Sequence, residues 1–278
     1  MDSETKDALR DAVRDRYACV ATNRSNKSSS QETALAQAFG YSDGELDSIP
    51  EEANLGVSCG NPTAMASLRP GEVVVDLGSG GGLDVFLAAQ KVGGSGKSIG
   101  IDMTPEMIKL ANRNLSRSSF DNVVFHLAEI EAMPLESASV DCVISNCVLN
   151  LVPDKEKAFA EIVRILKPGG RLAVSDIALH KIPPPEKEKD VRALTGCIAG
   201  AILIGTYREM LENASFSSVE ITDTKNDLNV YRELRAADVD SVSSTSPQSC
   251  CGDEDEAPRD IDFDVNEYAA SVRVLAIK

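Results

Sequence analysis

The stretch VVVDLGSGGGLD, residues 73–84, decides the fold of this 278-residue chain. Its three β-branched residues predict a short buried strand. Glycines follow at alternate positions, and the sequence from Leu83 onward has the apolar spacing of a helix. A strand, a tight glycine turn and a helix form the ligand-binding corner of a doubly wound α/β sheet, where glycine lets the backbone approach a ligand closely.

The glycine spacing indicates which ligand class this corner takes. Gly78, Gly80 and Gly82 read G-x-G-x-G, whereas a dinucleotide fingerprint needs its third small residue at Leu83. The spacing resembles the S-adenosylmethionine (AdoMet) loop of class I methyltransferases. A glycine-rich turn that binds nothing is the alternative, so the interpretation depends on the sequence that follows.

Strands and helices alternate regularly after this motif. A helix over 154–166 ends at the turn LKPGG, residues 166–170, which recurs in class I methyltransferases. This alternation predicts a mostly parallel, seven-stranded, doubly wound Rossmann-like sheet with helices on both faces. The predicted strands are 73–77, 97–102, 122–127, 139–145, 171–176, 216–222 and 268–277.

We expect the chain to be organised in five segments. A helical N-terminal extension, with helices over 5–23 and 33–46 around a polar loop, precedes the core. A cover segment and a sixth strand follow the core, and then an acidic, serine-rich insertion of low apolar content, which is expected to be mobile. The segments are 1–52, 53–180 for the AdoMet-binding core, 181–235 for the substrate cover and the sixth strand, 236–264 for the insertion and 265–278 for the last strand.

Composition excludes several classes of partner. The chain has 28 Lys and Arg against 44 Asp and Glu, a net charge of −16, so nucleic acid is not expected to bind. The charged N-terminus lacks an apolar signal segment, and no apolar run reaches 18 residues, so we expect a cytoplasmic protein without a membrane span. Seven cysteines favour thiol chemistry or soft-ion binding over a secreted disulfide framework.

Residues that follow the strands are the candidates for AdoMet binding, because ligands sit outside the carboxyl ends of parallel strands. Asp102 is placed to accept hydrogen bonds from ribose hydroxyls, although a capping role would explain it as well. Glu129 is placed at the adenine edge, or is a solvated carboxylate. The full predicted set is Asp76, Gly78, Gly80, Gly82, Asp102, Met103, Glu129, Ile130 and Asn146.

Three cysteines from distant segments can converge above the same edge of the sheet: Cys59, Cys147 and Cys197. Zinc normally uses C-x-x-C spacing, which is absent here. Trivalent arsenic suits three soft thiolates and keeps a lone pair on its open side. Taken singly, Cys147 and Cys197 would fit core packing equally well, and Cys19 and Cys142 are predicted to be packing residues.

The motifs around these cysteines resemble those of the AdoMet-dependent arsenite methyltransferases over roughly residues 8–222 and the final strand. The resemblance implies that Cys59, Cys147 and Cys197 bind As(III), and that Tyr17 lies near the cofactor. The matching motifs are ANLGVSCGNP (53–62), VVVDLGSGGGLD, GIDMTPEMI (100–108), ISNCVLNLVPDKEKAFAEIVRILKPGGRLAVSDI (144–177) and GCIAGA (196–201).

Two features depart from that family pattern. The polar loop over 23–31 carries serines where many relatives have a further cysteine, which puts the role of that extra thiol in doubt here. Conversely, Cys250 and Cys251 in the acidic insertion are candidate accessory thiols for arsenite capture or redox exchange.

The predicted reaction is SN2 methylation of arsenite or methylarsenite, free or as thiol conjugates, in arsenic detoxification. Cys147 and Cys197 are the predicted catalytic ligands, no general base is needed, and thioredoxin or glutathione would reopen any disulfide formed. Two alternatives stay open. One is a class I methyltransferase for an organic oxygen, nitrogen or carbon nucleophile, with structural cysteines. The other is a non-catalytic, arsenic-sequestering thiol protein.

Overall fold

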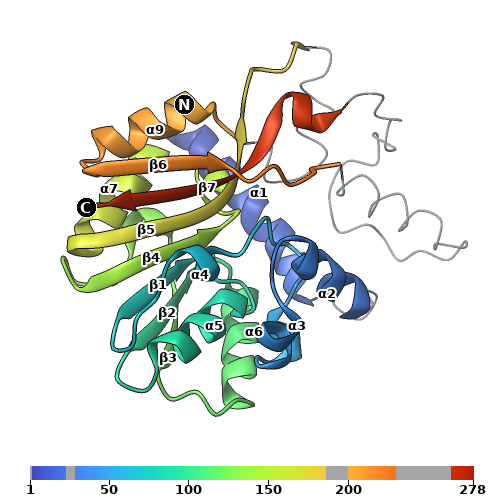
Figure 1. Cartoon of the computed structure of the whole chain (residues 1–278), viewed down its shortest axis with the longest axis vertical. Helices are drawn as coiled ribbons and strands as arrows, with labels where there is room; N and C mark the ends of the chain where they lie inside the picture. The colour runs from blue at the N-terminus through green and yellow to red at the C-terminus, as the bar shows by residue number, and fades with distance from the viewer. Residues whose placement is uncertain (1, 23–28, 186–199, 230–263) are drawn as a thin grey trace, which may run out of the picture.

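A computed structural model describes residues 2–22, 29–185, 200–229 and 264–278. Its centre is a seven-stranded sheet in the order β3-β2-β1-β4-β5-β7-β6 (Figure 1). Strands β1 to β5 pair in parallel, and β7 is antiparallel to both of its neighbours. The strands are β1 (Val73–Leu77), β2 (Lys97–Asp102), β3 (Val123–Leu127), β4 (Val140–Asn146), β5 (Leu166–Leu179), β6 (Ser218–Asp223) and β7 (Ala269–Ile277). The predicted fold class is confirmed.

The connecting helices lie on both faces of the sheet (Figure 1). The residues of β1 alternate between two apolar clusters, because successive side chains of a strand point to opposite faces. Val75 and Leu77 pack with residues of α7 and α9, whereas Val74 packs with residues of α4 and α5. The main helices are α1 (Ser3–Thr22), α2 (Ser29–Ala38), α3 (Asp43–Asp47), α4 (Pro62–Met65), α5 (Leu83–Val92), α6 (Pro105–Ser116), α7 (Lys155–Ile165) and α9 (Ile204–Asn213).

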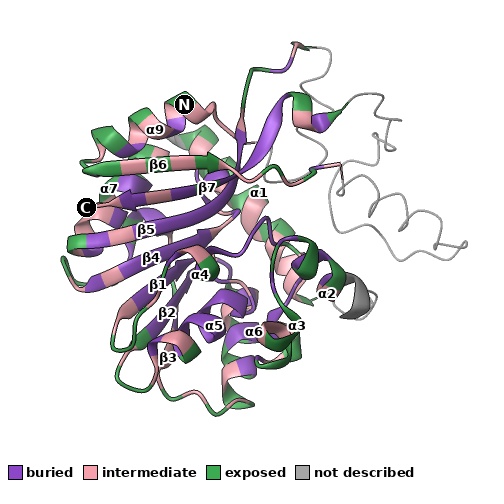
Figure 2. Ribbon diagram, in the orientation of Figure 1, coloured by how far each residue is buried: buried purple, intermediate pink, exposed green. Residues whose placement is uncertain are grey.

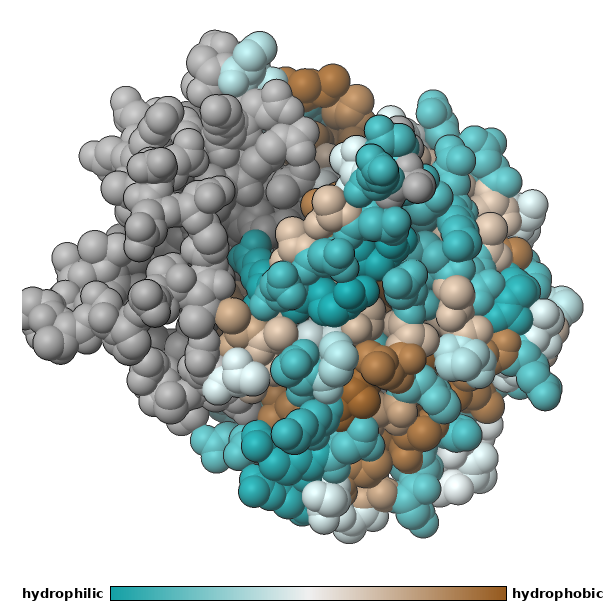
Figure 3. All heavy atoms as spheres, turned by 180° about the vertical axis from the view of Figure 1, so that it is seen from behind, coloured by the Kyte–Doolittle hydropathy of each residue, from teal (hydrophilic) through white to brown (hydrophobic). Residues whose placement is uncertain are grey.

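The central strands are buried on both faces, as Figure 2 shows for β1, β4 and β5. Near-continuous apolar runs such as those of β1 and β4 are typical of parallel strands covered by helices. From behind, the described surface is mostly hydrophilic, with brown hydrophobic side chains gathered in the lower half of the view (Figure 3). Among the described helices, none has the length and apolar character needed to cross a membrane.

The helix predicted over 33–46 is wrong as a single element. The structure has two helices instead, α2 and α3, and α2 already begins within the segment predicted as a loop. Gly40 breaks the helical path with φ +96°. Ser42 then starts α3 with a capping box, in which its hydroxyl accepts from the Glu45 backbone N–H and the Glu45 carboxylate accepts from the Ser42 N–H.

Helix α1 lies across the carboxyl edge of the sheet. Its residues Tyr17, Val20 and Ala21 pack against an apolar cluster that includes Met107 and Leu110 of α6. Charged groups fix its other end, because Lys6 Nζ lies 2.6 Å from Asp154 Oδ2. The N-terminal extension therefore forms part of the site at this edge.

Candidate active site

The glycine turn after β1 forms one wall of a cavity at the carboxyl edge of the sheet. Gly78 and Gly80 have φ values of +65° and +51°, in the left-handed region that favours glycine. A side chain at Gly78 would also collide with Val148. The turn is anchored by Asp102, whose Oδ2 accepts from the Gly80 N–H at 3.0 Å and whose Oδ1 accepts from the Thr104 N–H at 2.8 Å.

The cavity beside this turn holds about 780 Å³ of empty space, open solvent included. This volume is within the range of small-molecule sites. Eight residues singled out from the sequence line it, so chain segments from Tyr17 to Cys147 meet at one place. They are Tyr17, Gly78, Gly80, Asp102, Met103, Ile130, Asn146 and Cys147.

Three predicted cofactor residues do not line the cavity. Asp76 is buried within β1, where burial, followed by the nearby carboxylates of Asp84 and Asp102, raises its pKa well above the ordinary value. Gly82 is the N-cap residue of α5. Glu129 lies 3.4 Å from Arg10 Nε and faces α1. Their predicted roles in binding stay predictions.

The cavity also has lining residues that sequence reasoning missed. Arg10 of α1 and Glu131 both line it, and Arg10 Nη2 lies 3.3 Å from Glu131 Oε1. The side chain of Glu131 is almost fully buried. In the sequence, the only local sign of Glu131 is an acidic residue beside the apolar Ile130. Its partner Arg10 lies 121 residues away.

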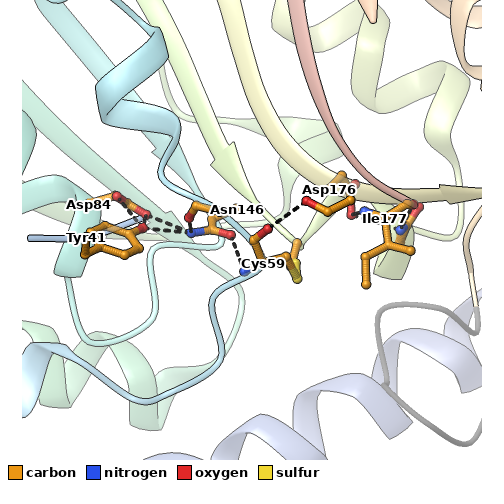
Figure 4. Close-up of a disulfide and its surroundings, with 10 residues drawn as sticks. Tyr41, Cys59, Asp84, Asn146, Asp176 and Ile177 are labelled. Carbon is orange, nitrogen blue, oxygen red and sulfur yellow. Dashed lines mark hydrogen bonds between the residues drawn. A yellow bond between two sulfur atoms is a disulfide. The ribbon is translucent and has the colours of Figure 1, made fainter. Parts of the chain in front are cut away.

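Cys147, which lines this cavity, meets Cys59, and the structure joins them as a disulfide with their Cα atoms 5.9 Å apart (Figure 4). Cys147 has φ +58°, a conformation that costs about 1–2 kcal/mol for a residue with a side chain. Its N–H donates to the Ser175 carbonyl at 2.9 Å. Strained backbone of this kind concentrates at functional sites.

Both cysteines are buried among apolar residues from the C-terminal part of the fold. Ile177, Tyr268 and Ala269 belong to the same cluster. The Ser271 hydroxyl donates to the Cys59 carbonyl at 3.2 Å, which ties the cysteine loop to β7. The sulfurs therefore lie in a dry place beside the cavity, with Cys147 forming part of its wall.

Cys197 lies outside the described residues, as do Cys250 and Cys251. The described chain resumes at Gly200, three residues after Cys197. A side chain at Gly200 would overlap the Asn150 carbonyl, and Ala201 packs against the cluster that contains Cys59 and Cys147. The role of Cys197 as a third ligand therefore stays a prediction.

The remaining described cysteines take other places. Cys142 is fully buried in β4, and burial raises its pKa to about 12. Its thiol therefore stays protonated and packs in the core, which confirms that prediction. Cys19 is half-buried on α1.

Asp176 of β5 is another buried carboxyl. It directly follows Ser175, whose carbonyl accepts from the Cys147 N–H. Its Oδ1 accepts from Asn150 Nδ2 at 2.9 Å and from the Ile177 N–H at 2.9 Å. Oδ2 has no hydrogen-bond partner among the described residues. Burial raises the pKa of Asp176 to about 7, although the Lys155 ammonium partly opposes this.

This pKa predicts a pH dependence of stability that Asp176→Asn removes. Between the ordinary pKa of 3.8 and about 7, the folded chain holds a proton that the unfolded chain has lost, so stability falls as pH rises. From pH 5 to pH 8, the wild type should lose about 3 kcal/mol of unfolding free energy through Asp176, and the variant should not show this loss. Urea unfolding at both pH values measures this, and parallel pH profiles for the two proteins would contradict it.

Comparisons with known proteins bear on the family and the fold of this chain. The family profile described as "Methyltransferase domain" matches residues 68–215, more than half of the chain. The arsenite methyltransferase of Halobacterium salinarum is 43% identical over 227 residues, which are 76% of this chain and 58% of the relative. That of Aquipseudomonas alcaligenes is 35% identical over 164 residues, 56% of this chain and 47% of the relative. The chain spans about half the length of these curated relatives.

A solved structure of an arsenic(III) S-adenosylmethionine methyltransferase from Chlamydomonas reinhardtii has a similar fold. It is 25% identical to this chain with a TM-score of 0.59, and the match covers 88% of this chain and 73% of that one.

Proposed function

This chain belongs to the methyltransferase domain family, and from that premise we propose that it methylates trivalent arsenic with AdoMet as the methyl donor. The proposed arsenic ligands are the thiolates of Cys59, Cys147 and Cys197, and arsenic detoxification in the cytoplasm is part of the proposal. The observation that supports it most is the position of Cys147. This residue lines the cavity beside the glycine turn and is also in contact with Cys59.

The size of the cavity and the chemistry of its walls suit AdoMet. Gly78 and Gly80, which the positive φ values there favour, have no side chain where a ligand would approach the turn. Asp102 keeps spare acceptor capacity for a ribose diol, since each carboxylate oxygen can accept more than one hydrogen bond. Met103 and Ile130 supply apolar surface for an adenine ring. When bound, AdoMet supplies a methyl group on a sulfonium.

Three soft thiolates suit arsenic better than they suit a hard cation. Arsenic bound by three sulfurs keeps its lone pair, and that pair would form the new bond to the methyl carbon. The bond from that carbon to the sulfonium sulfur breaks, and its electrons leave with the neutral thioether. The leaving group is already activated, so acceleration would come from positioning and from the dry site.

Arsenic that gives up its lone pair is oxidised by two electrons. Two thiolates can return these electrons and leave as a disulfide, and the proximity of Cys59 and Cys147 makes them the proposed pair. An external thiol reductant, such as thioredoxin or glutathione, would then have to reopen it before the next arsenic binds. We therefore expect turnover only in the presence of such a reductant.

Arsenic speciation after incubation tests the proposal. The reduced protein is mixed with arsenite, AdoMet and glutathione or thioredoxin, and the products are separated by liquid chromatography with arsenic-specific detection. We expect methylated arsenic to form in step with S-adenosylhomocysteine. Arsenite that binds but is never methylated would identify a sequestering protein. Demethylation of AdoMet only with an organic acceptor would identify a methyltransferase for an organic small molecule.

A further inference from the structure

A chain of hydrogen-bonded polar side chains joins the glycine-turn helix to the cysteine loop, and the proposed function gives its members Tyr41 and Asp84 no role. Asp84 is the second residue of α5, and its two carboxylate oxygens accept from the Tyr41 hydroxyl at 2.9 and 3.0 Å. Asn146 Nδ2 donates to the Tyr41 hydroxyl oxygen at 2.9 Å. Figure 4 shows these three side chains in a row beside Cys59.

The other contacts of Asn146 hold the loop that carries Cys59. Its Nδ2 donates to the Gly60 carbonyl at 2.8 Å, and its Oδ1 accepts from the Cys59 N–H at 3.0 Å. Asn146 is also the residue directly before Cys147 in the chain. One side chain therefore fixes the backbone of one cysteine while its own backbone leads into the other.

The orientation of the Asn146 amide is determined by its neighbours. Acceptors lie on its Nδ2 side: the Gly60 carbonyl, the Tyr41 hydroxyl oxygen and, at 3.3 Å, Asp84 Oδ2. A flipped amide would point its oxygen at a carbonyl and a carboxylate, and would leave the Cys59 N–H facing a donor. Buried polar groups left without partners in this way are costly.

The ionisation states of the partners keep this orientation at neutral pH. Burial, together with the Asp84 charge, raises the pKa of Tyr41 well above its ordinary value, so its hydroxyl keeps its proton. Burial raises the pKa of Asp84 to about 6, although its hydrogen bonds from Tyr41 and Asn146 oppose this. Near pH 7, Asp84 is therefore mainly a carboxylate that accepts, and Tyr41 is a donor to it.

We propose that Asn146, oriented by Tyr41 and Asp84, is the positioning residue that brings Cys59 within reach of Cys147 for a shared ligand atom. The inference rests on the proposed function for the identity of that atom, because arsenic is the substrate class the thiols would hold. The positioning itself is a property of the two thiols and can be measured without arsenic. Pre-alignment of two ligands raises their effective concentration toward each other.

The test compares Asn146→Asp with Asn122→Asp as a matched control. Asn122 Nδ2 donates to the Ala89 and Gly93 carbonyls at the other end of α5, so the same substitution disturbs a similar amide away from the cysteines. The readout is the equilibrium of the Cys59–Cys147 pair with glutathione, followed by alkylation and mass spectrometry of the cysteine peptides. A second readout is the KM for arsenite.

For Asn146→Asp we expect the effective concentration of the thiol pair to fall by about tenfold or more, because the Gly60 carbonyl loses its donor and faces a carboxylate oxygen instead. The KM for arsenite should rise by a similar factor. Asn122→Asp should leave the thiol equilibrium within twofold of wild type. A purely structural role for Asn146 would lower the unfolding temperature in both variants and move the thiol equilibrium in neither.

Tyr41→Phe keeps the inference testable if Asn146→Asp fails to fold. It removes only the hydroxyl that orients the amide, so the effective concentration of the thiol pair should fall threefold or more. A smaller change would overturn the proposal, as would an unchanged equilibrium in a folded Asn146→Asp protein. If wild type fails to methylate arsenite, the proposed function fails, and the thiol measurement still decides the positioning.

Discussion

Cys147→Ser is expected to lower arsenite methylation by at least about a thousandfold while AdoMet binding stays within threefold of wild type. Mutation of a residue that only holds a metal ligand in place typically lowers affinity or activity by about 10–100-fold. This variant removes a proposed ligand itself. Serine has nearly the same shape and can keep the Ser175 hydrogen bond, but its hydroxyl is a hard, protonated group that does not replace a soft thiolate. The loss should therefore appear in turnover and in arsenite affinity.

Cys142→Ser is the matched control, because Cys142 is also a buried cysteine but lies within β4 and packs in the core. We expect it to lose some unfolding free energy and to keep the wild-type rate. Initial rates by arsenic speciation and AdoMet affinity by calorimetry measure both variants. A Cys147→Ser protein that methylates arsenite at more than a tenth of the wild-type rate would refute the thiolate site.

Asp102→Ala is expected to weaken AdoMet binding by about a hundredfold or more. Hydrogen bonds to a charged group contribute about 1.5–3 kcal/mol each, and 1.4 kcal/mol is a factor of ten in affinity. The variant also releases the Gly80 and Thr104 N–H groups that Asp102 holds, so the glycine turn loses its anchor. Both effects act on the same cavity.

Asp102→Asn separates these two contributions, because an amide oxygen can still accept from one backbone N–H but carries no charge. We expect its loss of affinity to be intermediate. Asp121→Ala, which removes an exposed carboxylate just before β3, is the control and should bind AdoMet as wild type does. Calorimetric titration with AdoMet gives all four affinities, and a loss below tenfold for Asp102→Ala would contradict the assigned role.

Much of the fold could be predicted because the signals are local. The β-branched runs of β1 and β4 identify buried strands, and the structure places their ends within one residue of the predicted positions. The segment over 33–46 failed because its helical pattern continues through Gly40, where a left-handed residue and a new cap divide it. Pattern alone does not show whether such a glycine interrupts a helix.

Residues of the candidate site could be predicted only where they belong to a recognisable sequence motif. Alternating glycines and an acid at the end of β2 indicate the cavity, and the resemblance predicted that Cys59 and Cys147 meet across 88 residues. The link from Tyr41 to Asn146 spans 105 residues and has no periodic or motif signal. Buried hydrogen bonds between distant polar side chains depend on the finished packing, so sequence reasoning missed this one.

Arsenic X-ray absorption of the reduced protein with bound arsenite tests the central claim most directly. The account predicts a first shell of three sulfur atoms around arsenic in wild type, falling to two when Cys59, Cys147 or Cys197 is replaced by serine, and staying at three in Cys142→Ser. A shell that keeps oxygen neighbours in wild type, or that does not change when Cys147 is removed, would contradict it.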